Sequence, residues 1–457
     1  MHRSRGSCRT IFLPLAAALV LGCAVGAARA EPKYVGWAKV EACREIREFK
    51  EKLRDGGQLD ANAKLFLEET ALPQLALDDN RATIERTRKR IREVLLADVG
   101  DDKAAGEISL LIAQFMDALA RDEQVALVVR VNAMLLVGEL KAKGGSRPWP
   151  AAARFLAAAA GDAELPDAVR IAALAGVDKQ VKAGKGDEAI TKTCGPPVFA
   201  ILAEPVVAGR DVERDWLVSR ALQLVPLLAR PAPPQVAAAI VALLGDEARS
   251  VDLRVRAAAA LGATADAKSG VDAVAAVDTI KKLAIAVLEA EEKAAAARRF
   301  EDQYRRGGMA GGAAPGMPGP PPGMPLGPGM GFGGMPVPVV DPLATSEQAC
   351  RRAAWRLYTL ATAILAPDEA QGLVAILGDT AGPAKELAGQ LKAEALTIDA
   401  DPVEDALLDA LDVLRPPEAG ENAAKRPARQ PKPEQPEEEE SKPAAKPKAS
   451  PFDNPFK

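Results

Sequence analysis

Apolar residues recur along most of this chain with the spacing of amphipathic helices. In one stretch, Ile108, Leu111, Ile112, Phe115 and Leu119 follow an i, i+3, i+4, i+7, i+11 order. Such a stripe covers one face of an α-helix, whereas a half-buried strand would alternate apolar and polar residues. Stretches with that alternation are not found in the sequence, and we therefore expect an all-α protein.

One phrase of sequence occurs twice. Gly161-Asp162 is followed by Pro166-Asp167-Ala168-Val169-Arg170, and Gly245-Asp246 is followed by Val251-Asp252-Leu253-Arg254-Val255-Arg256. Arg170 and Arg256 are 86 residues apart, or two steps of 43. A fixed step of this size predicts stacked helix pairs, in which each Gly-Asp ends one helix and the following Asp and Arg begin the next.

This pattern resembles the HEAT-type α-solenoids, which are built from antiparallel helix pairs of similar length. The resemblance covers about residues 104–265, where arginines recur at 130, 170, 214 and 256. In that family, Asp and Arg at the start of the second helix tie the helix pairs together. The resemblance therefore implies a structural inter-helix tie at Asp167 and Arg170, and a second one at Asp252 and Arg256.

Two other parts of the helical region have distinctive patterns. The first 70 residues after the leader predict helices over 37–53, 61–72 and 82–96, with Asn80 as the N-cap of the last. That last helix carries a basic run (Arg86, Arg88, Lys89, Arg90 and Arg92), which is either a patch for an acidic partner or membrane surface, or a solvated face. Farther on, Gly195-Pro196-Pro197 predicts a break in a helix, because proline lacks the N–H donor.

The organisation of the whole chain follows from these patterns and from two biased segments. Residues 307–342 contain 12 glycines and 10 prolines, and residues 416–457 contain ten prolines among mixed charges. Such compositions cannot bury a core, so we expect both segments to be disordered. We therefore expect a signal peptide (1–30), an N-terminal helical cap (31–103), HEAT-like helix pairs (104–306), a Gly/Pro/Met-rich loop (307–345), C-terminal helices (346–415) and a tail (416–457).

The N-terminus has the features of an export signal. Three arginines precede an apolar run from Ile11 to Val25, and Ala28 and Ala30 supply the small residues at which a signal peptidase cuts. The run is short for a transmembrane helix, and no second run of spanning length follows it. Cys23 offers an alternative, because Val20-Leu21-Gly22-Cys23 resembles the lipobox of bacterial lipoproteins. Either reading exports the chain to the bacterial periplasm or cell envelope.

The side chains that remain after residue 30 exclude several kinds of chemistry. The only histidine is His2, so a chain cut after Ala30 has no Ser-His-Asp triad and no histidine metal ligand. Cys43, Cys194 and Cys350 are far apart, which does not match a zinc or redox motif. Loss of four leader arginines leaves 55 basic and 63 acidic residues, a net charge of −8 that argues against nucleic-acid binding. We expect no catalytic, cofactor or metal site.

Taken together, these features favour a non-enzymatic extracytoplasmic scaffold that binds an unidentified protein or peptide. Two alternatives stay open at this point. One is a cell-envelope structural lipoprotein anchored at Cys23. The other is a carboxylate-dependent enzyme acting on glycans, although such enzymes use aromatic platforms for sugars and aromatic residues make up only 4% of the chain.

Overall fold

The computed structural model describes residues 34–54, 59–96, 99–142, 147–185, 187–204, 211–309, 346–365, 372–400 and 404–415. Most of these residues are helical, and none of them belongs to a strand, which confirms the all-α prediction for the described part of the chain. The leader with Cys23, Ala28 and Ala30 lies outside the described residues. So do residues 310–345 of the predicted loop and the predicted tail from residue 416.

The helices have the following bounds, in chain order: α1 (Trp37–Ala42), α2 (Arg44–Arg54), α3 (Ala61–Phe66), α4 (Ile84–Leu96), α5 (Asp102–Arg121), α6 (Leu127–Glu139), α7 (Pro150–Gly161), α8 (Asp167–Ala183), α9 (Glu188–Leu202), α10 (Asp211–Leu228), α11 (Pro234–Gly245), α12 (Val251–Thr264), α13 (Ala273–Met309), α14 (Ser346–Leu365), α15 (Leu373–Leu377), α16 (Gly382–Ala400) and α17 (Glu404–Leu414). A π-helical turn covers Leu67–Ala71, and 3-10 turns cover Leu72–Leu75, Asp78–Thr83 and Gly378–Thr380. Because α13 continues to Met309, the first three residues of the predicted loop are helical.

The N-terminal helices differ from the sequence prediction at two boundaries. The helix expected over 37–53 is divided at Cys43, whose backbone is extended. Asn80 does not cap α4, which begins four residues later at Ile84. Instead, the Asn80 side chain is buried and donates to the backbone carbonyl of Gln74 at 2.7 Å. Burial of an amide requires such a partner, so this contact fixes the turn that precedes α4.

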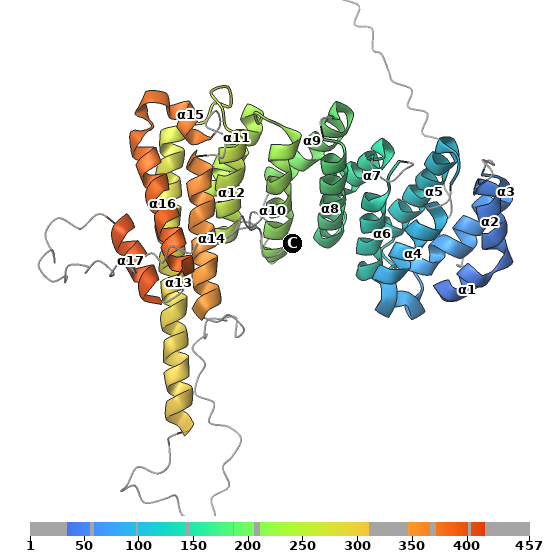
Figure 1. Ribbon diagram of the computed structural model, residues 1–457, viewed down its shortest axis with the longest axis horizontal. Coiled ribbons are helices and arrows are strands. Elements are labelled where there is room, and N and C mark those ends of the chain that lie inside the picture. Colours follow the sequence, from blue (N-terminus) through green and yellow to red (C-terminus); the bar gives the residue numbers. More distant parts are fainter. Residues whose placement is uncertain are drawn as a thin grey trace, which may run out of the picture.

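From α5 onward the helices follow one another in packed pairs, which are arranged along the long axis of the molecule (Figure 1). We call α5, α7, α9, α11 and α13 the first helices and α6, α8, α10, α12 and α14 the second helices. Each second helix packs against the next one, and α14 packs against α16. The second helices therefore form a continuous row, and one contiguous apolar core extends from Trp37 to Leu414.

In three of the pairs, the loop between the first and the second helix has the same conformation. The residue after the first helix is Asp122, Asp162 or Asp246. Its carboxylate accepts the N–H two residues later, and its carbonyl accepts the N–H three residues later. Aspartate favours such turns because its short side chain can bond the backbone just ahead of it. The two Gly-Asp phrases of the sequence therefore form one recurrent turn between paired helices.

Helix α9 runs through Pro196 and Pro197, where the sequence predicted a break. Each proline lacks an N–H donor, so two backbone hydrogen bonds are lost and the helix is locally less stable. The apolar residues on either side keep one helical face, however, and Cys194, Val198 and Ile201 are all buried. Since α9 packs against both α7 and α10, tertiary packing outweighs the local preference of the prolines.

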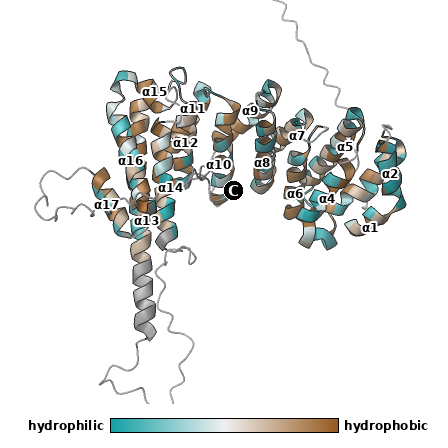
Figure 2. Cartoon of the chain, in the orientation of Figure 1, coloured by the Kyte–Doolittle hydropathy of each residue, from teal (hydrophilic) through white to brown (hydrophobic). Residues whose placement is uncertain are grey.

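Hydrophilic and hydrophobic residues occur together on the helices of this row (Figure 2). Among the described residues, no helix combines the length and the apolar character that a membrane span requires.

Candidate functional site

A buried arginine recurs near the start of the second helices. In three pairs its Nε atom donates to the backbone carbonyl ten residues earlier: Arg130 to Ala120 at 2.7 Å, Arg170 to Ala160 at 2.9 Å and Arg254 to Leu244 at 3.0 Å. Those carbonyls lie in the last turn of the preceding first helix, where helical N–H partners have run out. Each arginine therefore joins the two helices of its own pair.

Asp167 and Arg170, which the HEAT resemblance marked as a tie, lie together in the interior. Arg170 is fully buried, and its guanidinium is 3.5 Å from the Asp167 carboxylate and 2.5 Å from that of Glu204. Arg214 of α10 also contacts Glu204, and it is 3.7 Å from Asp167. The cluster thus connects α8 to the next pair, because Glu204 directly follows α9.

The charge of Glu204 is stabilised by these neighbours. Burial by itself raises the pKa of this carboxyl group, but Arg170 and Arg214 bond to the ionised form and bring the pKa below its ordinary value. The carboxylate therefore remains charged between two buried arginines, as buried ions must be paired to be tolerated.

Asp252 and Arg256 make different contacts from Asp167 and Arg170. The bond to the preceding helix belongs to Arg254, two residues before the predicted Arg256. Asp252 accepts from Arg356 of α14 at 2.8 Å, and Arg256 lies over the ring of Trp355, 5.6 Å from its centroid. A different spacing identifies the recurrent arginine correctly. It comes eight residues after the turn aspartate in each case: Asp122 and Arg130, Asp162 and Arg170, Asp246 and Arg254.

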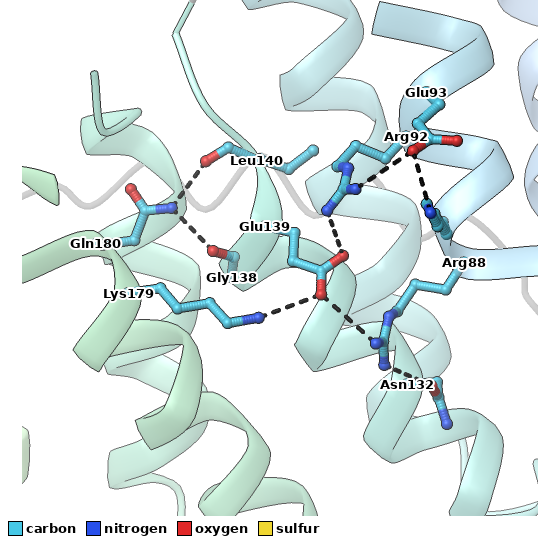
Figure 3. A network of polar contacts seen from close by, with 10 residues as sticks. Arg88, Arg92, Glu93, Asn132, Gly138, Glu139, Leu140, Lys179 and Gln180 are labelled. Carbon is cyan, nitrogen blue, oxygen red and sulfur yellow. Dashed lines mark hydrogen bonds and ion pairs between the residues drawn. The ribbon is translucent and has the colours of Figure 1, made fainter. Parts of the chain in front are cut away.

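The basic run on α4 is largely paired rather than simply solvated. Arg88 and Arg92 contact the Glu139 carboxylate at 3.5 and 3.0 Å, and Lys179 of α8 reaches the same group at 3.2 Å (Figure 3). Arg88 also donates to Asn132 at 2.7 Å. Glu139 therefore joins α4, α6 and α8 at one point, which gives these arginines a structural role within the chain.

The second helices α10, α12 and α14 carry an accessible surface of a different kind. It consists of Trp216 and Arg220 on α10, Arg256 on α12 and Trp355 on α14, and we refer to it as the Trp–Arg surface. Trp216 has 60% of its surface exposed, and Arg220 follows it by one helical turn. Because α10 packs against α12 and α12 against α14, the four side chains come from three adjacent helices.

The electrostatics of the Trp–Arg surface leave two arginines without an ion pair. Arg256 is partly buried, and this burial lowers its pKa; Asp252 opposes the effect, and the positive charge of Arg220 adds to it. Neighbouring ions are paired with one another, because Arg356 contacts both Asp252 and Glu291 and Arg352 contacts Glu291. Within the described residues, no carboxylate lies within ion-pair distance of Arg220 or Arg256.

The Trp–Arg surface combines two kinds of side chain that are common at protein interfaces. Tryptophan and arginine are the side chains that most often dominate the energy of protein interfaces, since each combines a flat apolar face with hydrogen-bond donors. Among the described residues, no group of His, Cys, Asp and Glu side chains has a metal-binding arrangement. Cys43, Cys194 and Cys350 are all buried, and burial raises the pKa of Cys194 to about 11.

No protein-family model matches the chain, and no curated protein matches its sequence.

Proposed function

We propose that this chain is a non-enzymatic scaffold of the HEAT-like α-solenoid type, which binds a protein or peptide through the Trp–Arg surface. One observation carries the proposal. Trp216 has 60% of its surface exposed and lies one helical turn from Arg220, and α10 packs against α12, which carries Arg256; neither arginine has an ion pair with another described residue. Covering an exposed indole with a partner is favourable, because it removes apolar surface from water.

The solenoid assignment is supported by features that repeat from pair to pair. The turn aspartates 122, 162 and 246 have the same hydrogen bonds, and the arginines eight residues later have the same bond to the preceding helix. Repeat architectures stack units that each contact mainly their neighbours, and the resulting extended face is the part that partners use.

Export is the second part of the proposal. The basic start, the apolar run and Ala28-Arg29-Ala30 support cleavage after residue 30 and a place in the bacterial periplasm or cell envelope. A mature chain that begins at Glu31 supports this version. A chain that begins at a lipidated Cys23 supports the lipoprotein instead, and N-terminal mass analysis of the protein from its own cells separates the two.

Binding is tested with the purified chain as bait for a cell-envelope fraction. We expect proteins that the wild-type chain retains to be lost when Trp216→Ala and Arg220→Gln are combined. Arg154→Gln and Leu65→Ala serve as matched controls, because both residues are exposed on first or N-terminal helices away from the surface. If the double variant captures the same proteins as the wild type, the Trp–Arg surface is not the binding site.

A further inference from the structure

The ion pairs around the Trp–Arg surface define the kind of ligand that it can hold. Arg352 and Arg356 share Glu291 and Asp252, so two cations are matched by two acids. Within the described part of the chain, the Arg220 side chain donates to Gln223 at 2.9 Å and forms no ion pair, and Arg256 lies over Trp355. Two positive charges therefore remain for an incoming group, and carboxylates bond arginine strongly when both are removed from water.

The apolar part of the surface requires that the ligand also carry groups that pack on Trp216. Trp216 is exposed beside Val212, one turn earlier on α10, which is 73% exposed. Proline-rich segments dock on exposed aromatic side chains in other recognition modules, because their extended polyproline conformation is already formed before binding. The surface thus suits a segment in which prolines precede a run of acids.

The chain contains one such segment within reach. Pro433-Glu434-Gln435-Pro436 has the P-x-x-P spacing and leads directly into Glu437-Glu438-Glu439-Glu440. Eighteen residues lie between Arg415, the last described residue after α17, and Glu434, and this stretch spans up to about 60 Å when extended. Helix α17 packs on α13 and α14, and α14 carries Trp355. A tethered segment at such a distance has an effective concentration of about a millimolar, which favours it over dilute competitors.

We propose that residues 433–440 of this same chain occupy the Trp–Arg surface, with the prolines on Trp216 and the glutamates on Arg220 and Arg256. The inference rests on the proposed function, since it makes the segment a competitor of the external partner for the same face. Two nearby acids limit how the segment can lie. Asp252 is beside Arg256, and Glu213 is seven residues, about 10 Å, from Arg220 along α10. The glutamates therefore bind between the two arginines rather than at either end.

The first measurement uses the full chain and the fluorescence of Trp216, taken as the difference between the chain and its Trp216→Phe variant. In a tail variant, Glu434 and Glu437 to Glu440 are replaced by Gln. We expect acrylamide quenching of Trp216 to increase at least about twofold in this variant, because a millimolar effective concentration keeps the site mostly occupied in the wild type. R220Q/R256Q should give the same increase. E418Q/E421Q, which removes two other tail acids, and R154Q should leave quenching unchanged.

The second measurement adds a synthetic peptide of residues 431–444 to the same proteins. We expect it to bind the tail variant, to bind the wild type about tenfold more weakly because of the tethered competitor, and not to bind R220Q/R256Q in the tail-variant background. Binding should weaken as salt is raised, since the contacts are between charges.

Three outcomes would overturn the inference. Equal affinity of the peptide for wild type and tail variant would show that the segment does not occupy the site in its own chain. Concentration-dependent dimers that the tail variant abolishes would place it on a second copy. No binding of the peptide to any form, while envelope partners still require Trp216, would remove the inference and leave the proposed function intact. If the peptide binds as expected but no envelope partner depends on Trp216, the inference stands and the proposed function fails.

Discussion

Gly138 of α6 and Gly176 of α8 lie backbone against backbone where the two helices cross. A Cβ atom placed on Gly138 would overlap the Cα atom of Gly176, and one placed on Gly176 would lie 3.0 Å from the Cα atom of Gly138 and 2.6 Å from Cδ2 of Leu156. Gly262 has the same relationship to the backbone of Ala363 farther along the row. Close crossings of the second helices therefore depend on the absence of a side chain at these positions.

The first prediction concerns this crossing. Gly138→Ala should lower the free energy of unfolding by about 1–3 kcal/mol, because the added methyl group forces α6 and α8 apart. Gly106→Ala on α5 is the control, since a Cβ there meets no atom within 4 Å. Alanine is the better helix former, so this control should stabilise the chain by about 1 kcal/mol. Urea unfolding followed by circular dichroism measures both values, and destabilisation of equal size in the two variants would contradict the prediction.

The second prediction concerns the buried charge cluster. Arg170→Met should destabilise the chain by about 3–5 kcal/mol, because it removes the fully buried positive charge that contacts the carboxylates of Asp167 and Glu204. Arg154→Met removes an exposed arginine and should change stability by less than about 0.5 kcal/mol. Thermal unfolding of both variants under the same conditions measures the two changes in stability. A small effect at Arg170 would mean that water reaches the cluster.

The third prediction gives the pH dependence of the same cluster. The pKa of Glu204 in the folded chain is lower than its ordinary value of 4.5. Its ionised form thus contributes stability that is fully present above pH 4.5 and is lost as the pH falls through the folded-state pKa. Glu204→Gln should be less stable than the wild type at pH 7, and the difference should shrink as the pH is lowered below 4.5. Urea unfolding at a series of pH values measures it. A difference that stays constant would assign the effect to packing.

The fourth prediction concerns the contact between Arg256 and Trp355. A double-mutant cycle with Arg256→Met and Trp355→Leu should give a coupling energy of about 0.5–1 kcal/mol, as a partly exposed cation–π pair does. Arg220→Met paired with Trp355→Leu is the control cycle. Arg220 donates to Gln223, and among the described residues it has no contact with the ring of Trp355, so this coupling should be close to zero. Equal coupling in both cycles would show that charge, rather than the stacked ring, is responsible.

The sequence predicted the features of this chain that depend on local periodicity. Stripes such as Ile108 to Leu119 gave the helices, and the two Gly-Asp phrases gave the turns between them. It assigned the recurrent arginine correctly at Arg170 but chose Arg256 in place of Arg254. The prediction aligned the Val-Arg pair of the two phrases, whereas the structure follows the spacing of eight residues from the turn aspartate. The pairing of Asp252 with Arg356 joins residues 104 positions apart, and no local pattern contains such information.

The Trp–Arg surface was beyond sequence reasoning for a related reason. Trp216, Arg256 and Trp355 lie on three helices whose packing brings them together, and nothing in the neighbourhood of each residue distinguishes it from a core or surface position. Trp216 is exposed and the other two are partly buried, and only the packing of α10, α12 and α14 shows that they come from adjacent helices. The continuation of α9 through Pro196 and Pro197 has the same origin, since burial of its apolar face exceeded a local preference.

The last prediction concerns the thiols. Cys194 is fully buried, donates only to the carbonyl of Ala153 at 3.9 Å, and has a pKa raised by burial to about 11. The reactive form of a thiol is the thiolate, which is therefore scarce at pH 8 and also shielded from reagent. Iodoacetamide should leave the Cys194 peptide unmodified in the native chain and label it fully in guanidinium chloride, as mass spectrometry would show. Rapid labelling of the native chain would mean that α9 opens readily at its two prolines, and Pro196→Ala together with Pro197→Ala should then slow the reaction.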